Sequence, residues 1–362
     1  MRVAFRCDAS LDIGSGHVMR SLTLAKKLRS NGADCVFFSK EHRGNLIDAI
    51  LRNGFACEVL PLQKNYRGRG DSYASWLGGD WRHDAERTVD FLRRDYFDWL
   101  VVDHYALDSR WESLVDKECR RILAVDDLAN RQHHCDVLLD QNLGRSDADY
   151  RVLVPEYCKL LLGPSYALLR SEFKAACSTA MCMRKRHSLG NLFINMGGVD
   201  RDNFTGKVLS ALKHITLPAD LSVTIVLGAS NPWVSEIQAL AGDMCQQVKV
   251  CVGADNMAEL MAAADLAIGA AGRTSWERCC LGLPTFTAVI AENQVGIAKD
   301  LEIAGAAWTI DMQNIETWLA GAFTKILANP EILYDMFVAA SIICDGDGAG
   351  RVSGILVSEL GQ

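Results

Sequence analysis

A glycine-rich turn between a short strand and a helix constrains this chain more than any other stretch. The turn, Gly14-Ser15-Gly16-His17, follows an apolar strand at residues 2–5 and opens a helix whose apolar residues recur at helical spacing as far as Leu28. Glycines at such a turn let the backbone approach a ligand closely, and the free N–H groups at a helix start favour an anion. A second strand at residues 34–39 completes a β-α-β unit, so we expect a parallel sheet with an anion site at its first turn.

His17 lies at the start of this helix. The positive end of the helix dipole disfavours an imidazolium ion, so we expect a neutral ring that can accept a proton, as a general base must. Glycine-rich strand-to-helix turns are also common in α/β proteins that use no histidine at this point. The motif alone therefore leaves a catalytic and a structural His17 open.

Length and charge narrow the class of protein. The 362 residues exceed what one ordinary core holds and indicate two domains. A net charge of −7 argues against binding to nucleic acid or to an anionic membrane, because both require a basic face, and it favours a small-molecule partner. The 13 cysteines show no paired CxxC spacing. We see no secretory leader before the first strand, and no apolar run is long enough and uncharged enough to span a bilayer. We therefore expect reduced thiols in a cytoplasmic protein.

Strands of the first half end in polar residues. The buried strand at residues 99–102 leads into Asp103-His104-Tyr105, and the carboxyl ends of strands face the ligand in open α/β sheets, so Tyr105 is a candidate to hydrogen-bond a substrate. The pair Asp126-Asp127 after the next strand suits turn capping or structural pairing better than a metal site. We interpret His133-His134-Cys135 as structural, and residues 63–80 as a long surface loop without readable function.

The second half of the chain also contains glycine-rich turns between a strand and a helix. We place the domain boundary at the charged stretch 183–188, which gives domains at residues 1–175 and 189–362. The strand at residues 192–195 leaves through Gly197 and Gly198 into a helix. We therefore expect a second phosphate contact here, since another helix start follows a glycine turn.

A small-residue turn at Gly269–Gly272 leads into another helix. Thr274 and Ser275 at its start suit phosphate oxygens, and Glu277 one turn later can accept hydrogen bonds from ribose hydroxyls. Plain N-capping explains Thr274 and Ser275 equally well when they are taken alone. Because two such turns follow strands of one predicted sheet, the combination favours a nucleotide site.

Six segments, in order over nearly the whole chain, carry a family resemblance: Arg6–Asp8, Ile13–Arg20, Asp103–Tyr105, Gly163–Arg170, Thr274–Glu277 with Asn293 and Gln294, and Asp345–Val352. With these segments the chain resembles the PseG family, UDP-2,4-diacetamido-2,4,6-trideoxy-β-L-altropyranose hydrolases of pseudaminic acid biosynthesis, which supplies flagellin or other surface glycans. That family is similar to GT-B glycosyltransferases of the MurG type. The resemblance implies an α/β, GT-B-like fold, with two Rossmann-like domains whose parallel sheets face a central cleft.

The resemblance also implies roles for residues. His17 would be the base that deprotonates a water attacking the anomeric carbon with inversion, and Tyr105 and Asn293 would orient the sugar or the water. The first domain would hold the sugar, and the second would bind UDP with Glu277 at the ribose. The other implied substrate or UDP contacts are Gly14, Ser15, Gly16, Arg20, Gly197, Gly198, Arg273, Thr274, Ser275 and Gln294.

Arg273 departs from the family pattern, in which we expect a small residue or threonine after the glycine. It either adds a cation near the diphosphate or changes the packing of the loop. No metal or other cofactor is expected, because UDP is a fair leaving group and helix dipoles can stabilise its growing charge.

Two alternatives stay open. A GT-B glycosyltransferase would use a UDP-sugar donor with an acceptor hydroxyl in place of water, and a non-catalytic sensor would bind the nucleotide sugar without turnover. A lipid-acceptor transferase would carry an exposed apolar or basic patch on the first domain, and none stands out in the sequence.

Overall fold

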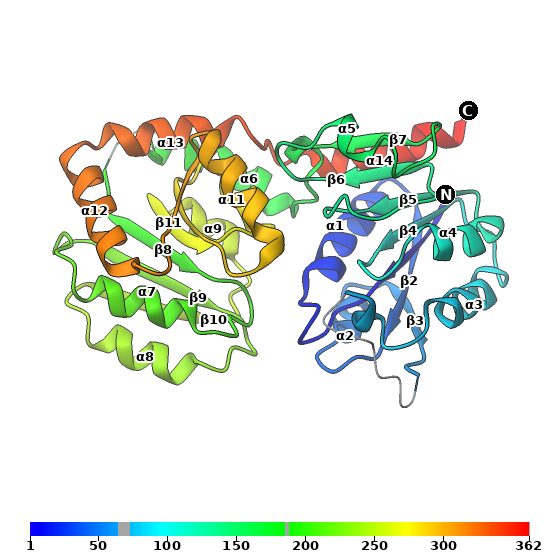
Figure 1. The fold of residues 1–362 in the computed structure, drawn as a ribbon, viewed down its shortest axis with the longest axis horizontal. Coiled ribbons are helices and arrows are strands. Elements are labelled where there is room, and N and C mark those ends of the chain that lie inside the picture. Colours follow the sequence, from blue (N-terminus) through cyan, green and yellow to red (C-terminus); the bar gives the residue numbers. More distant parts are fainter. Residues whose placement is uncertain (64–72, 185–187, 362) are drawn as a thin grey trace. The chain divides into compact units, whose positions relative to one another are not determined.

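The computed structural model describes residues 1–63, 73–184 and 188–361. The chain divides into two compact units, the first formed by residues 1–168 with 347–362 and the second by residues 169–346 (Figure 1). Each unit contains one sheet of parallel strands with helices around it. The expected α/β architecture with two parallel sheets is therefore confirmed.

The first unit is built on a seven-stranded sheet of order β3-β2-β1-β4-β5-β6-β7. Alternate residues of β1 enter two separate hydrophobic cores, Val3 and Phe5 one of them and Ala4 the other, so the sheet is covered on both faces. Its strands are β1 (Arg2–Cys7), β2 (Asp34–Lys40), β3 (Ala56–Leu60), β4 (Trp99–Asp103), β5 (Arg121–Val125), β6 (Val137–Asp140) and β7 (Lys159–Leu162). Its α-helices are α1 (Gly16–Ser30), α2 (Ile47–Arg52), α3 (Trp81–Leu92), α4 (Ser109–Val115), α5 (Asp147–Tyr150) and α14 (Gly348–Ser358).

The second unit is built on a six-stranded sheet of order β10-β9-β8-β11-β12-β13. Its strands are β8 (Asn191–Asn195), β9 (Ser222–Leu227), β10 (Gln247–Val252), β11 (Leu266–Ala270), β12 (Thr285–Ala288) and β13 (Ala307–Thr309). Its α-helices are α6 (Ser171–Arg184), α7 (Phe204–Leu212), α8 (Val234–Gly242), α9 (Met257–Ala262), α10 (Thr274–Cys280), α11 (Val295–Ile303), α12 (Ile315–Ala328) and α13 (Glu331–Ser341).

The C-terminal helix α14 belongs to the first unit, where Figure 1 shows it in red beside β6 and β7. This differs from the predicted domain at residues 189–362. Val352 and Leu356 are buried in the same core as α1, and the indole N–H of Trp99 donates to the carbonyl oxygen of Leu356 at 3.0 Å. The helical pattern of α14 is visible in the sequence, but its apolar face does not reveal which sheet it covers.

The predicted surface loop at residues 63–80 is only partly described, since residues 64–72 lie outside the described ranges. Its last part forms a short 3₁₀ helix, η1 (Tyr73–Leu77), with Leu77 buried. Within the described parts of the chain, we find no helix both long enough and apolar enough to cross a membrane.

Candidate active site

The turn after β1 and the carboxyl end of β4 bring His17 and Asp103 together. Gly14 has φ of +77°, a left-handed conformation that glycine adopts without strain, and α1 starts two residues later. β1 pairs with β4 in parallel register, with Cys7 opposite Asp103, so both strand ends lie at one edge of the sheet. His17 is 5% exposed, and its Nδ1 atom lies 2.6 Å from Oδ1 of Asp103.

The contact between His17 and Asp103 assigns the tautomer of the imidazole. A carboxylate only accepts hydrogen bonds, so Nδ1 of His17 carries the hydrogen and donates it to Asp103. The neutral ring then has its lone pair on Nε2, the nitrogen turned away from the carboxylate. This is the form that a general base requires.

Arg20, one turn further along α1, also binds the Asp103 carboxylate. Its Nε and Nη2 atoms donate to the two oxygens of Asp103 at 2.6 Å each, and its Nη1 donates to Asp127 at 2.8 Å. Burial alone would raise the pKa of Asp103, but the positive charge of Arg20 and the hydrogen bonds from Arg20 and His17 outweigh burial and hold this pKa well below its usual range. Asp103 is therefore ionised at any physiological pH.

Tyr105 lies with its ring edge-on to His17, at 4.6 Å between ring centroids. Burial, together with the nearby negative charge of Asp127, raises the pKa of the Tyr105 hydroxyl well above its usual range, so the hydroxyl keeps its hydrogen. Trp76 stacks on Tyr105 at 5.7 Å, and Tyr73 meets it edge-on at 5.0 Å. Both residues belong to η1, in the predicted loop at residues 63–80. The sequence has no periodicity there, so their aromatic character was the only signal that could have identified them.

The first unit also contains a buried ion network. Arg6 donates to both oxygens of Asp8 at 2.7 and 2.9 Å and to Asp84 at 2.7 Å, and Lys40 lies 2.8 Å from Asp84. Burial lowers the pKa of His104 to about 3, so this ring is neutral. Two cations thus meet two anions, and no buried charge in this network lacks a counter-ion.

The acidic pair after β5 has two separate structural tasks. Asp126 accepts hydrogen bonds from the backbone N–H of Ala129 at 2.9 Å and from Arg131 at 2.7 Å, whereas Asp127 pairs with Arg20. Capping and pairing were the uses favoured from the sequence. Among the described residues, no group of three or more His, Cys, Asp or Glu side chains is arranged to hold a metal ion.

In the second unit, the turns after β8, β9, β11 and β12 lie at one edge of the sheet, because these strands are parallel neighbours. Gly197 has φ of +95°, and a Cβ added to Gly228 would lie 2.1 Å from the carbonyl oxygen of Gly198. The turns after β8 and β9 therefore touch, and only glycine permits this approach. A Cβ added to Gly272 would lie 3.9 Å from Nε2 of Gln294, so the turns after β11 and β12 also lie close together.

The first turn of α10 carries the other expected nucleotide contacts. Thr274 is half-buried and Ser275 is buried. The Glu277 side chain is 17% exposed, and its Oε1 atom lies 3.9 Å from Nη2 of Arg170. Burial raises the pKa of Glu277, and the positive charges of Arg170 and Arg273 oppose this. A partly exposed carboxylate can accept hydrogen bonds from a ligand.

The expected site residues thus form two groups, one on each unit. The first unit brings together Gly14, Ser15, Gly16, His17, Arg20 and Tyr105, and the second carries Gly197, Gly198, Arg273, Thr274, Ser275, Glu277, Asn293 and Gln294. Asn293 is exposed in the short helix η4 (Glu292–Gln294). Sequence reasoning missed Asp103 as the partner of His17; its only signal was an acidic residue at the end of a buried strand.

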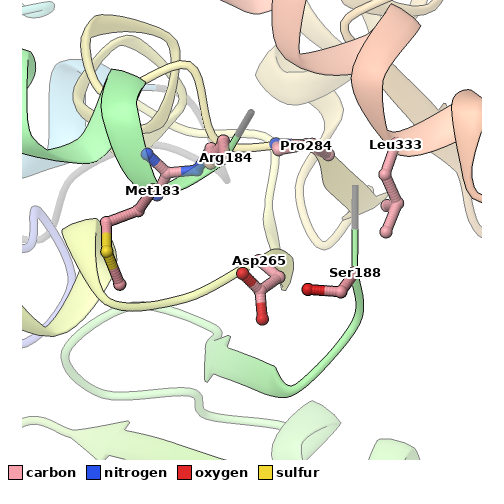
Figure 2. A pocket seen from close by; sticks show the side chains of 6 residues that line it. All are labelled: Met183, Arg184, Ser188, Asp265, Pro284 and Leu333. Carbon is pink, nitrogen blue, oxygen red and sulfur yellow. The ribbon is translucent and has the colours of Figure 1, made fainter. Parts of the chain in front are cut away.

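A pocket in the second unit lies away from these residues. Its lining is shown in Figure 2 and consists of Met183, Arg184, Ser188, Asp265, Pro284 and Leu333. Asp265 and Pro284 directly precede β11 and β12, so the pocket lies at the amino-terminal edge of the sheet. The glycine turns follow the carboxyl ends of the same strands, at the opposite edge.

Comparison with known proteins places this chain among enzymes of nucleotide sugars. Residues 191–343 match the family described as Glycosyltransferase family 28 C-terminal domain. The chain is 30% identical over 262 residues to the UDP-2,4-diacetamido-2,4,6-trideoxy-beta-L-altropyranose hydrolase of Campylobacter jejuni, a match covering 72% of this chain and 81% of that protein. The chain belongs to the PseG family. The family resemblance seen in the sequence motifs is therefore confirmed.

This PseG-family chain shares its fold with solved GT-B structures. MurG of Acinetobacter baumannii superposes with a TM-score of 0.70 at 18% identity, over 99% of each chain. Anabaena HepE, solved in complex with UDP-glucose, gives a TM-score of 0.60 at 14% identity over 99% of this chain and 100% of its own. At such identities the likeness concerns the fold, and it confirms the expected GT-B-like class.

Proposed function

We propose that this chain hydrolyses UDP-2,4-diacetamido-2,4,6-trideoxy-β-L-altropyranose to UDP and the free sugar, as a step of pseudaminic acid biosynthesis. The observation that carries the proposal is the 2.6 Å contact between Nδ1 of His17 and Asp103, which assigns a basic Nε2 to a histidine at a glycine turn. The name of the Campylobacter jejuni relative supports this substrate.

The proposed step is one displacement at the anomeric carbon. The oxygen of a water attacks this carbon, the bond from the carbon to the UDP oxygen breaks with its electron pair leaving on UDP, and the configuration inverts. Nε2 of His17 takes the proton that the water loses, and Asp103 stabilises the imidazolium that forms. A base of this kind contributes roughly 10²- to 10⁴-fold to a rate.

Arg20 acts in this scheme as a positioning residue. The sequence motif makes Arg20 a candidate substrate contact, but the residue is only 3% exposed and its guanidinium binds two carboxylates. We propose that Arg20 fixes the rotamer of Asp103 and thereby the orientation of the His17 ring. The glycine turn Gly14–Gly16 then remains the part of this motif that contacts the substrate, through backbone N–H groups.

Tyr105 contributes a hydroxyl and an aromatic face next to the base. The surrounding rings of Tyr73 and Trp76 suit the apolar parts of a trideoxy sugar, whose C6 methyl and acetamido methyl groups avoid water. We propose Asn293 as a second orienting group for the sugar or the water. It stands on the second unit, directly before Gln294.

UDP is proposed to bind at the glycine turns of the second unit. Gly197, Gly198 and the Arg273–Ser275 segment would contact the diphosphate, and Gln294 lies beside Gly272. Glu277 would accept hydrogen bonds from the ribose hydroxyls, for which its slight exposure is sufficient. The positive charge of Arg273 next to these turns would favour the leaving group.

A glycosyltransferase with a UDP-sugar donor is the second candidate. The match of residues 191–343 to the Glycosyltransferase family 28 C-terminal domain favours it, because that family is named for sugar transfer. The two candidates share the donor and differ in the nucleophile, which is water in one and an acceptor hydroxyl in the other.

Incubation of the protein with the UDP-sugar and no acceptor separates these candidates. The hydrolase releases UDP and free sugar in equal amounts, whereas a transferase turns over only when an acceptor is added. The same reaction in ¹⁸O-labelled water should leave UDP unlabelled, because the bond at the anomeric carbon breaks. Label in the β-phosphate of UDP, or no turnover without an acceptor, would contradict the proposed reaction.

A further inference from the structure

Arg278 on α10 is a buried cation without a carboxylate partner among the described residues. It is 1% exposed, and its Nη2 atom donates to the carbonyl oxygen of Ala270 at 2.8 Å and to Oγ of Ser275 at 2.9 Å. Its Nη1 atom lies 3.3 Å from Oγ1 of Thr274, and its Nε atom has no hydrogen-bond partner in the described chain. The buried Arg6 and Arg20 of the first unit each bind two carboxylates instead.

The strand β11 makes room for this guanidinium with a glycine. A Cβ added to Gly269 would lie 2.5 Å from Nη1 of Arg278 and 3.0 Å from the carbonyl oxygen of Asn195. Ala270 and Asn195 are the last residues of β11 and β8. The charge therefore lies at the carboxyl ends of the two strands whose turns carry Gly197, Gly198 and Gly272.

The hydrogen bonds of Arg278 also fix how Thr274 and Ser275 use their hydroxyl groups. A guanidinium has only donors, so each hydroxyl oxygen accepts from Arg278 and keeps its own hydrogen for an acceptor elsewhere. Ser275 is buried, whereas Thr274 is half-buried at the start of α10 and can reach a ligand. The contact with Arg278 therefore leaves the Thr274 hydroxyl as a hydrogen-bond donor. A phosphate oxygen of a ligand can accept this bond.

The buried charge of Arg278 favours a counter-ion. Burial lowers the pKa of Arg278 to about 10, which leaves the guanidinium protonated at neutral pH. Buried ions in proteins are as a rule paired, because an uncompensated charge costs several kcal/mol. The charge of Glu277 opposes the effect of burial only in part. A bound nucleoside diphosphate at the adjacent turns would supply further negative charge.

We infer that Arg278 is a positioning residue for the diphosphate of the nucleotide, acting through its charge and through the donor orientation that it imposes on Thr274. This inference rests on the proposed function, since it assumes that the turns of the second unit bind UDP. It assigns a task to a side chain that the family motif, which ends at Glu277, leaves out.

The test compares UDP, UMP and uridine as ligands of the full-length protein and its Arg278→Met and Arg278→Lys variants, by calorimetric titration. We expect Arg278→Met to lose about 10- to 100-fold in affinity for UDP, less for UMP, and under about twofold for uridine. Arg278→Lys keeps the charge and should recover part of the loss for UDP.

Arg184→Met is the matched control. Arg184 is also buried, its pKa is also lowered to about 10 by burial, and it donates to the carbonyl oxygens of Leu281 and Met261. It lines the pocket at the amino-terminal edge of the same sheet, so its loss should weaken UDP and uridine binding equally or not at all. A UDP-selective loss in Arg184→Met equal to that in Arg278→Met would refute the inference.

A double-mutant cycle covers the case in which Arg278→Met does not fold. Thr274→Val should weaken UDP binding in the wild-type protein and weaken it less in Arg278→Lys, because the lysine no longer orients the hydroxyl. Equal effects in both backgrounds, or an equal loss for UDP and uridine in Arg278→Met, would show a merely structural arginine. Failure of the wild-type protein to bind UDP would instead overturn the proposed function itself, and the inference with it.

Discussion

Asp103 accepts a hydrogen bond from His17, which lies 86 positions before it in the chain. Asp103→Asn removes the charge but keeps the shape, and an amide can either donate to or accept from Nδ1 of His17. The ring then loses its fixed tautomer, so we expect kcat to fall about 10²- to 10⁴-fold. UDP affinity should change by less than about twofold, because the proposed UDP contacts lie on the other unit.

Two quantities should be measured for Asp103→Asn, kcat with the UDP-sugar and the dissociation constant of UDP. Ser21→Ala is a suitable control, since Oγ of Ser21 also faces Asp103 but at 3.5 Å, too far for a strong hydrogen bond. If Asp103→Asn kept the wild-type kcat, Asp103 would have no part in orienting the base.

At the scale of elements, η1 brings two aromatic rings to Tyr105. Trp76→Ala removes the ring stacked on Tyr105, so the sugar loses apolar contact area while UDP does not. We expect the specificity constant for the trideoxy UDP-sugar to fall about tenfold, consistent with the loss of about 1–1.5 kcal/mol from one aromatic contact. Phe91→Ala is the control, because Phe91 stacks on Phe38 elsewhere in the first unit; a tenfold drop there as well would argue against a sugar contact by Trp76.

The carboxyl end of β6 carries a pH-dependent element. Burial, with the nearby charge of Asp127, raises the pKa of Asp140 from 3.8 to about 7, against the opposing effects of its hydrogen bonds and of Arg145. The hydroxyl of Tyr150 lies 2.8 Å from Asp140 and 3.1 Å from Asp126, and it has one hydrogen for these two carboxyl groups. A proton on Asp140 completes this set of hydrogen bonds.

The sign of the pH effect follows from this raised pKa. Between about pH 4 and pH 7 the folded state binds a proton that the unfolded state has lost, so the contribution of Asp140 to stability is full below about pH 4 and is lost as the pH rises through about 7. Asp140→Asn cannot titrate. In urea unfolding at pH 5 and pH 8, the wild-type protein should lose more stability than Asp140→Asn, by on the order of a few kcal/mol. Equal losses in the two proteins would show that Asp140 is ionised in both states.

At the scale of the whole molecule, the last helix of the chain, α14, packs into the core of the first unit. Leu356 on α14 is fully buried in the core that α1 and β4 also form. Leu356→Ala should lower the free energy of unfolding of the first unit by about 2–5 kcal/mol. UDP affinity should stay unchanged, since the proposed nucleotide contacts lie in the second unit; a variant that loses UDP binding and keeps its stability would place α14 functionally with the second unit.

Much of this fold and the two glycine-turn regions could be predicted from the sequence. The alternation of strands and helices and the turns at Gly14–Gly16 and Gly197–Gly198 depend on nearby residues, and these are local signals. The partner of His17 could not be predicted, because the Asp103 contact depends on β4 lying beside β1 in the sheet. Sheet order is a property of the folded chain and not of any short segment.

The same reason explains the other differences. Arg20 reads as a candidate substrate contact in its motif, but the ends of β4 and β5 place two carboxylates around it. Arg278 follows the motif that ends at Glu277, and only its burial against Gly269 shows a cation that binds no carboxylate directly in the described parts of the chain. In each case a residue of recognisable chemistry acquires its task from a neighbour far away in the chain.

The most direct test of His17 as the general base is the acceptor-free hydrolysis rate of His17→Ala, measured beside its affinity for UDP. We predict a rate about two to four orders of magnitude below that of the wild-type protein, with the fold and the UDP affinity nearly intact. A rate close to that of the wild-type protein would contradict a reaction in which this imidazole takes the proton from water.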